Sequence, residues 1–197
     1  MYRRFAFIAP IAAISLAGCG LNAIPTAEEN VNAKWAQVQS EYQRRADLIP
    51  NLVSTVKGYA KQESTVLIEV TQARAAAGSI KLSAADLSDP GKVKAFNDAQ
   101  NRVSAAIIPL QRLQEAYPDL KSNANFLTLQ SQIEGTENSI LVSRKDYNEA
   151  VQAYNTRIRT FPDAIGAKIF YGAKAKTMFE ASSGSQAAPK VDFGNNG

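Results

Sequence analysis

The stretch YQRRADLIPNLVSTVKGY, Tyr42 to Tyr59, decides how the helices of this chain are counted. It places two arginines, an aspartate and Pro50 inside a segment whose apolar residues otherwise recur at helical spacing. Proline donates no backbone hydrogen bond, and its ring clashes with the preceding turn of a helix. Pro50 therefore either redirects the chain between two helices or kinks one long helix.

Four runs of apolar residues at steps of three and four predict helices along the chain. They cover roughly residues 31–49, 52–78, 92–116 and 121–160. Pro109 lies inside the third run and predicts a kink there, and residues 79–91, which contain Ser, Asp, Pro and Gly, predict a loop. Residues 163–180 predict a short helix followed by an irregular segment. Because no segment alternates as a strand would, the predicted class is all-α.

Helix lengths favour a turn at Pro50. A helix continuing through Pro50 would run about 50 residues, or roughly 75 Å, whereas the third run gives only about 38 Å. A turn at Asp47–Asn51, with Asp47 capping the freed backbone N–H groups, gives more nearly equal rods. The prediction is an antiparallel, up-and-down four-helix bundle with long helices kinked at prolines. The alternative is a three-helix bundle of long kinked helices.

The N-terminus has the layout of a lipoprotein signal. A basic MYRR precedes an apolar run that is short and interrupted by Pro10, followed by Leu16-Ala17-Gly18-Cys19. This tetrapeptide resembles the bacterial lipobox, in which the Cys thiol takes a diacylglyceryl group and becomes the mature N-terminus. Cys19 is also the only cysteine, which excludes a disulfide within one chain. An uncleaved N-terminal anchor helix is the alternative to lipidation of Cys19.

These boundaries predict four regions in the 197-residue chain. They are a signal peptide (1–18), a lipid-anchored tether (19–26), a helical domain (27–180) and a disordered tail (181–197). Without the signal, 20 Lys and Arg residues face 18 Asp and Glu, so no excess of basic charge indicates nucleic-acid binding. We expect an extracytoplasmic protein attached to a membrane through Cys19.

Catalytic chemistry finds little support in the residue types. The chain has no histidine, which removes the commonest general base and metal ligand. Glu134 and Glu137 share a helix face and could belong to a carboxylate metal site, but such sites usually add histidines. Ion pairs with Arg44, Arg45 or Arg144 are the expected alternative. The prediction is therefore a structural polar network without a cofactor or metal.

A Tyr-Asn pair repeats after seven residues, at Tyr147-Asn148 and Tyr154-Asn155. This interval returns nearly the same face of a helix, so both pairs should meet one neighbour. Packing with register control by the amides is the favoured interpretation. The alternative is a cleft lined by these four residues and Trp35 that binds a small molecule or an envelope polymer.

Two long segments carry a resemblance to a known family. RRADLIPNLVSTVKGYAKQE and NFLTLQSQIEGTENSILVSRKDYNEAVQAYNTRIRTFPDAIGA resemble the LemA family of bacterial envelope proteins, and the later Phe179-Glu180 also matches. The likeness extends from about Asn30 to Glu180. It implies an antiparallel helical bundle outside the cytoplasmic membrane, and the family has no established enzyme activity.

The chain departs from the family at its N-terminus. Members typically carry a membrane-spanning helix, whereas this chain has a lipobox followed by Gly20. By analogy with proteobacterial lipoproteins, Gly20 favours export to the periplasmic face of the outer membrane in a Gram-negative source. The expected function is a non-enzymatic envelope lipoprotein that acts as a scaffold or binds a protein partner.

Overall fold

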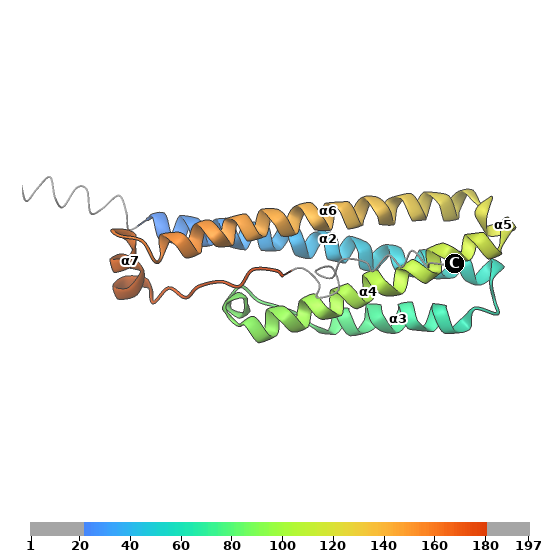
Figure 1. Cartoon of the computed structure of the whole chain (residues 1–197), viewed down its shortest axis with the longest axis horizontal. Helices are drawn as coiled ribbons and strands as arrows, with labels where there is room; N and C mark the ends of the chain where they lie inside the picture. The colour runs from blue at the N-terminus through green and yellow to red at the C-terminus, as the bar shows by residue number, and fades with distance from the viewer. Residues whose placement is uncertain (1–21, 181–197) are drawn as a thin grey trace, which may run out of the picture.

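The structure is a computed structural model that describes residues 22–180. Every regular element in this range is a helix, which confirms the predicted all-α class. The long helices are α2 (Ala23–Tyr59), α3 (Ser64–Ser79), α4 (Pro90–Ala116) and α6 (Ala124–Arg157). They lie side by side along the long axis of the molecule and alternate in direction, with α2 packed on α6 and α3 packed on α4 (Figure 1). None of the helices within residues 22–180 combines the length and apolarity needed to cross a membrane.

The predicted turn at Asp47–Asn51 is wrong, because α2 continues through Pro50 to Tyr59. The chain turns instead at residues 60–63, between α2 and α3. Pro50 has no N–H to donate to the carbonyl of Ala46 one turn earlier, and the Arg74 side chain of α3 supplies the missing donor. Its Nε lies 2.6 Å from the Ala46 oxygen. A side chain of the neighbouring helix α3 thus makes the hydrogen bond that Pro50 cannot make, and α2 continues through this position.

Asp47 does not cap a helix, since it lies in the middle of α2 with its side chain exposed. Its Oδ1 accepts a hydrogen bond of 2.7 Å from Gln43 Nε2 on the preceding turn. The caps lie at Asp89, which accepts from the backbone of Gly91 and Lys92 at the start of α4, and at Asn123, which accepts from Phe126 at the start of α6.

The helix ends and loops elsewhere lie close to their predicted positions. Pro109 lies inside an unbroken α4, and α4 ends at Ala116, just before Tyr117-Pro118. The predicted loop at 79–91 contains the short 3₁₀ helix η2 (Ala85–Ser88), and α5 (Pro118–Lys121) leads into α6.

The predicted tether at 19–26 overlaps the first turn of α2, which begins at Ala23 and buries Ile24. Ile24 packs in the core, so the helical domain begins four residues earlier than predicted. Cys19, the predicted signal peptide and the predicted tail lie outside the described residues.

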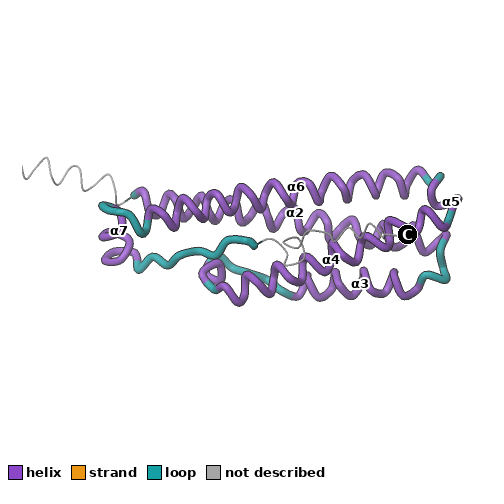
Figure 2. Tube along the Cα trace, in the orientation of Figure 1, coloured by secondary structure: helices purple, strands orange, loops and turns teal. Residues whose placement is uncertain are grey.

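The last described residues turn back along the bundle. The helix α7 (Asp163–Gly166) and the short π-helix η3 (Ala167–Tyr171) form one end of the molecule. Gly172 then adopts the left-handed conformation (φ 53°), which glycine reaches without strain, and redirects the chain. Residues 172–180, which we call the strap, run as extended chain back beside the helices (Figure 2).

The core consists of two clusters arranged along the rod. The apolar stripe of α2 at steps of three and four serves both, because Val31 to Tyr42 face the first cluster and Ile49 to Val56 the second. The first also holds Phe96, Tyr147 and Tyr154, with Phe179 of the strap. The second is built mainly from α3, the later part of α4 and the beginning of α6. Arg45 lies on α2 between the residues that serve the two clusters.

Candidate functional site

Arg45 is the most deeply buried charge among the described residues, with 1% of its surface exposed. Its Nη1 donates to Ser104 Oγ (2.7 Å) and Glu137 Oε1 (2.9 Å), and its Nη2 donates to the Gln100 backbone oxygen (3.1 Å) and side-chain Oε1 (2.5 Å). The guanidinium also lies over the ring of Tyr42, 5.1 Å from its centroid. A buried charge is tolerated when it is paired and hydrogen-bonded, and Arg45 meets both conditions with partners on two other helices.

The residues predicted for the polar network are Arg44, Arg45, Asp47, Glu134, Glu137 and Arg144. Of these six, the structure pairs only Arg45 with Glu137. Glu134 is exposed one turn earlier and accepts from Gln130 Nε2. Arg44 is exposed, and among residues 22–180 no carboxylate lies within ion-pair distance of it. Arg144 turns toward the strap, where its Nη2 donates to the Glu180 backbone oxygen (3.0 Å).

The two predicted asparagines hold the strap on α6. Asn148 Nδ2 donates to the Phe179 carbonyl (3.0 Å) and its Oδ1 accepts from the Phe179 N–H (2.8 Å). Asn155 makes the same pair of hydrogen bonds with Lys176, both 2.8 Å. Seven residues of helix rise about 10.5 Å and three residues of extended chain span about 10 Å, so the two spacings match. The single neighbour implied by the repeat is therefore the strap.

The aromatic residues predicted to line a cleft are brought together and covered. Trp35, Tyr147 and Tyr154 are each at most 3% exposed. The Phe179 ring packs against Tyr147 and Trp35, at centroid distances of 5.2 and 6.0 Å. The Tyr147 hydroxyl donates to the Thr177 carbonyl (3.0 Å), and burial raises the pKa of Tyr147 well above its ordinary value. A ligand that took the place of the Phe179 ring would have to displace the strap.

Lys176 holds the strap against α2 and against the loop that contains η2. Its side chain is 7% exposed, and its Nζ pairs with Glu28 of α2 (2.9 Å) and donates to the Ala84 carbonyl (3.2 Å). The backbone N–H of Thr177 donates to the Leu87 carbonyl (2.7 Å). The sequence did not single out Lys176 or Thr177, since an extended segment without strand alternation leaves no periodic signal. Phe179 entered only through the family resemblance.

Two surface clefts flank Arg45. One, of about 530 Å³, is bordered by α2, the end of α3 and α4, and includes Arg74 and Asp86. The other, of about 450 Å³, is bordered by α4, α6 and the strap, and includes Glu137 and Arg144. Both are large enough for a small molecule. However, the Arg45 guanidinium between them already has four hydrogen-bond acceptors on its own chain.

The model of the LemA family matches residues 34–193, a range that includes Arg45, the Asn148–Asn155 repeat and the strap. The chain belongs to the LemA family. Within the family range lie all the contacts that join α6 to the strap. The sequence resemblance to the LemA family is thus confirmed.

Two kinds of relative extend this likeness to the LemA family. Protein LemA of Metamycoplasma hominis is 26% identical over 124 residues, which are 63% of this chain and 52% of that protein. Magnetosome proteins MamQ 1 and MamQ 2 of Paramagnetospirillum magneticum are each 27% identical over 157 residues, which are 72% of this chain and 58% of each relative. The chain thus spans little more than half the length of the relatives it matches. None of these names specifies a reaction.

Proposed function

We propose that this LemA family protein is a non-enzymatic, lipid-anchored envelope protein whose helical rod acts as a scaffold or partner-binding module. The main support is that the polar side chains that could have formed a reactive or binding site make hydrogen bonds within the chain itself. Arg45 binds groups of α4 and α6, and Asn148 and Asn155 bind the backbone of the strap. The exposed faces of the long helices are then the surfaces left for a partner.

The lipid anchor is supported by the lipobox and by the start of α2. Cys19 is separated from Asn22, where the described chain begins, by only Gly20 and Leu21. A lipid on Cys19 would attach the rod at the end where α2 begins (Figure 1). Gly20 after the lipid-bearing Cys favours the periplasmic face of the outer membrane in a Gram-negative source.

The anchor is tested by replacing Cys19 with Ser in the full chain. The unchanged protein should incorporate a radiolabelled fatty acid and sediment with membranes. Cys19→Ser should incorporate none, and should either leave the membrane fraction or keep its signal uncut. Normal processing of Cys19→Ser with full membrane attachment would exclude the anchor.

The partner is sought by photo-crosslinking in intact envelopes. A photoreactive amino acid replaces Leu141 on α6, which is 63% exposed, and Ile68 on α3, which is 54% exposed, serves as a second site on another face. A scaffold should give a defined protein adduct that depends on the position of the probe. Diffuse capture of abundant neighbours from both positions would contradict a partner-binding role.

A further inference from the structure

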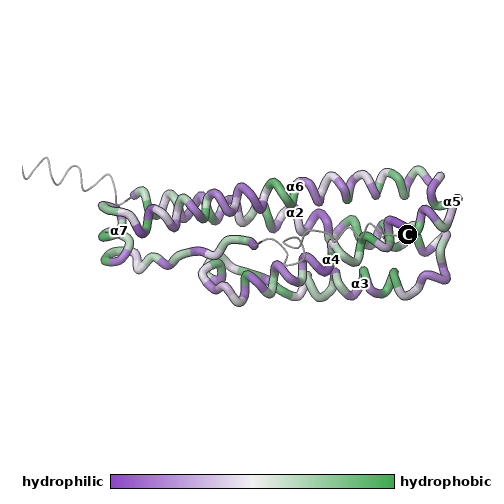
Figure 3. Tube along the Cα trace, viewed as in Figure 1, coloured by the Kyte–Doolittle hydropathy of each residue, from purple (hydrophilic) through white to green (hydrophobic). Residues whose placement is uncertain are grey.

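The end of the molecule formed by α7 and η3 has the reverse of the usual packing pattern. Its small residues Gly166 and Ala167 are buried, whereas large apolar residues point outward. We call this outward group the apolar tip; it comprises Phe161, Ile165, Ile169, Phe170 and Tyr171, which are between 44% and 83% exposed. Figure 3 shows hydrophobic residues in green at this end. Several exposed large apolar residues at one end of a molecule mark a contact with another apolar phase or a partner.

Basic residues are frequent in the segment that carries the apolar tip. Between residues 157 and 176 the chain has five Lys and Arg residues and one acidic residue, Asp163. Asp163 is paired with Arg157, at 3.3 Å. Arg159, Lys168 and Lys174 are exposed, and no carboxylate of residues 22–180 lies within ion-pair distance of them. Apolar and aromatic residues with cationic neighbours are the combination that binds the interface of anionic bilayers.

The apolar tip lies beside the start of α2. Arg157 joins the two, because its Nη1 donates to the Ala23 carbonyl (3.1 Å) while its Nε pairs with Asp163 at the start of α7. Cys19 precedes Asn22 by three positions, and each residue spans at most about 3.6 Å, so the reach is roughly 11 Å. A lipid on Cys19 would therefore hold this end of the rod against the bilayer surface.

We infer that the apolar tip inserts into the interfacial region of the membrane to which the chain is anchored, with Arg159, Lys168 and Lys174 contacting anionic phospholipid headgroups. This inference rests on the proposed lipid anchor for the identity of the apolar phase. Together, the anchor and the tip attach the same end of the rod at two points. The opposite end, at α5, then projects away from the membrane.

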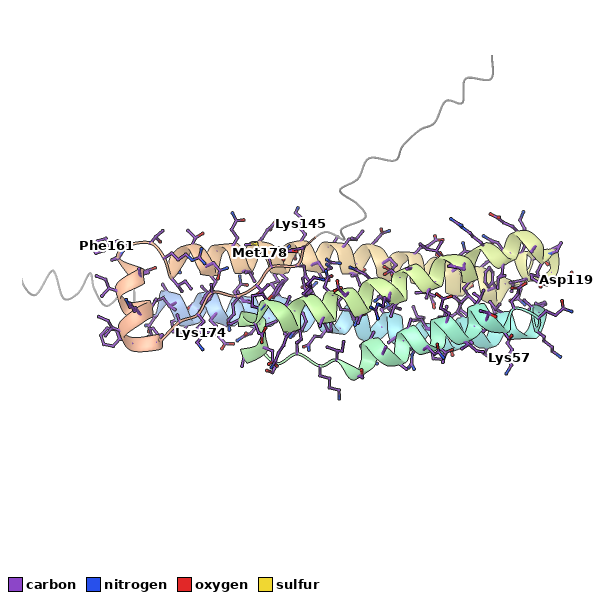
Figure 4. The ribbon with its side chains drawn as sticks, turned by 60° about the horizontal axis from the view of Figure 1, so that its bottom comes forward. Lys57, Asp119, Lys145, Phe161, Lys174 and Met178 are labelled. Atoms are coloured by element: carbon purple, nitrogen blue, oxygen red, sulfur yellow. The ribbon has the colours of Figure 1, made fainter. Side chains whose placement is uncertain are left out.

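A position-specific probe tests the insertion. In a full chain carrying Cys19→Ser, which has no other cysteine, Ile169→Cys is labelled with an environment-sensitive fluorophore and mixed with vesicles of phosphatidylethanolamine and phosphatidylglycerol. The emission should shift to the blue and be quenched by lipids that carry a nitroxide near the headgroup. The matched control is Asp119→Cys on α5, at the end of the molecule opposite Phe161 (Figure 4). Because both proteins have the same N-terminal residues, the difference between them reports the tip alone.

Two further variants separate apolar from ionic contacts. Phe161→Ser with Phe170→Ser should abolish the shift at position 169 while leaving the helical circular dichroism unchanged, since both rings are largely exposed. Lys168→Gln with Lys174→Gln should reduce the shift on phosphatidylglycerol vesicles and have no effect on vesicles of phosphatidylcholine alone. An unchanged shift in the serine variant would overturn the inference.

The remaining outcomes are equally decisive. Equal quenching at positions 169 and 119, or none at 169, would overturn insertion of the tip. A shift at 169 without vesicles that grows with protein concentration would show that a second copy covers the tip instead. Lipid labelling of Cys19 is measured separately: a quenched tip with an unlabelled Cys19 overturns only the anchor, and a labelled Cys19 with an unquenched tip overturns only the insertion.

Discussion

Arg45 shows how a single charge joins three helices. It occupies a position in the apolar stripe of α2 between Tyr42 and Ile49, where its aliphatic stem lies in the core and its guanidinium reaches α4 and α6. Apolar periodicity alone does not indicate Arg45 at this buried position, because charged residues are rarely buried. Sequence reasoning could name Arg45 as one of three candidate arginines, but choosing among them requires knowledge of the rotation of α2 against α6.

Glu137→Gln tests the network at the residue scale. The substitution leaves the Arg45 charge buried without a carboxylate, and since Glu137 is itself 33% exposed, water can compensate in part. We expect the free energy of unfolding to fall by about 1–3 kcal/mol, measured by urea denaturation. Glu134→Gln, the same change one turn earlier at an exposed position, should alter it by less than about 0.5 kcal/mol. Equal losses in the two variants would refute the assigned role of Glu137.

At the scale of the elements, Pro50 lies within α2 and does not separate two helices. The predicted turn at Asp47–Asn51 was based in part on the backbone hydrogen bond that a proline removes. That hydrogen bond is indeed absent at Pro50. The sequence could not show that Arg74, from the next helix, would donate the hydrogen bond that the Ala46 carbonyl lacks. The strap was not predicted either. Its partners Asn148 and Asn155 on α6 were recognised as a repeat, but an extended segment has no periodic sequence pattern that would identify it as their neighbour.

A double-mutant cycle tests the link between α2 and α3. Arg74→Met keeps much of the aliphatic stem but leaves the Ala46 carbonyl without a donor, so the free energy of unfolding should fall by about 1 kcal/mol. In a Pro50→Ala background, the N–H of residue 50 can bind that carbonyl, and Arg74→Met should then cost little. The expected coupling is about 1 kcal/mol by chemical denaturation. Arg102→Met, at an exposed position on α4, should show no coupling with Pro50→Ala.

At the scale of the whole molecule, the two core clusters share the long helices but are covered by different segments of the chain. The second cluster is covered by α3 and α4. The first extends beyond the start of α4 and receives Phe179 from the strap. The number and approximate lengths of the later helices followed from apolar periodicity. The division of the core did not, because it depends on a segment that is not helical.

Phe179→Ala tests this division. Removing a buried aromatic ring should lower stability by about 3 kcal/mol, and the loss should fall on the first cluster. Hydrogen exchange should quicken in the first half of α2 and the second half of α6, while α3 retains its protection. Met178→Ala, the adjacent and exposed strap residue, is the matched control and should change neither region. Uniform acceleration along all four long helices would show that the clusters open as one unit.

The strap also sets an order of events in time. Synthesis delivers the chain from its N-terminus, so α2, α3, α4 and α6 are all available before residues 172–180 emerge. Helix pairs joined by short turns assemble quickly, whereas the pairing of Lys176 with Glu28 unites opposite ends of the described chain and must wait. Until the strap docks, Tyr147, Asn148 and Asn155 of α6 lack the partners that the strap provides. The first cluster, whose residues extend from Ile24 to Phe179, is therefore the last part of the core to be closed.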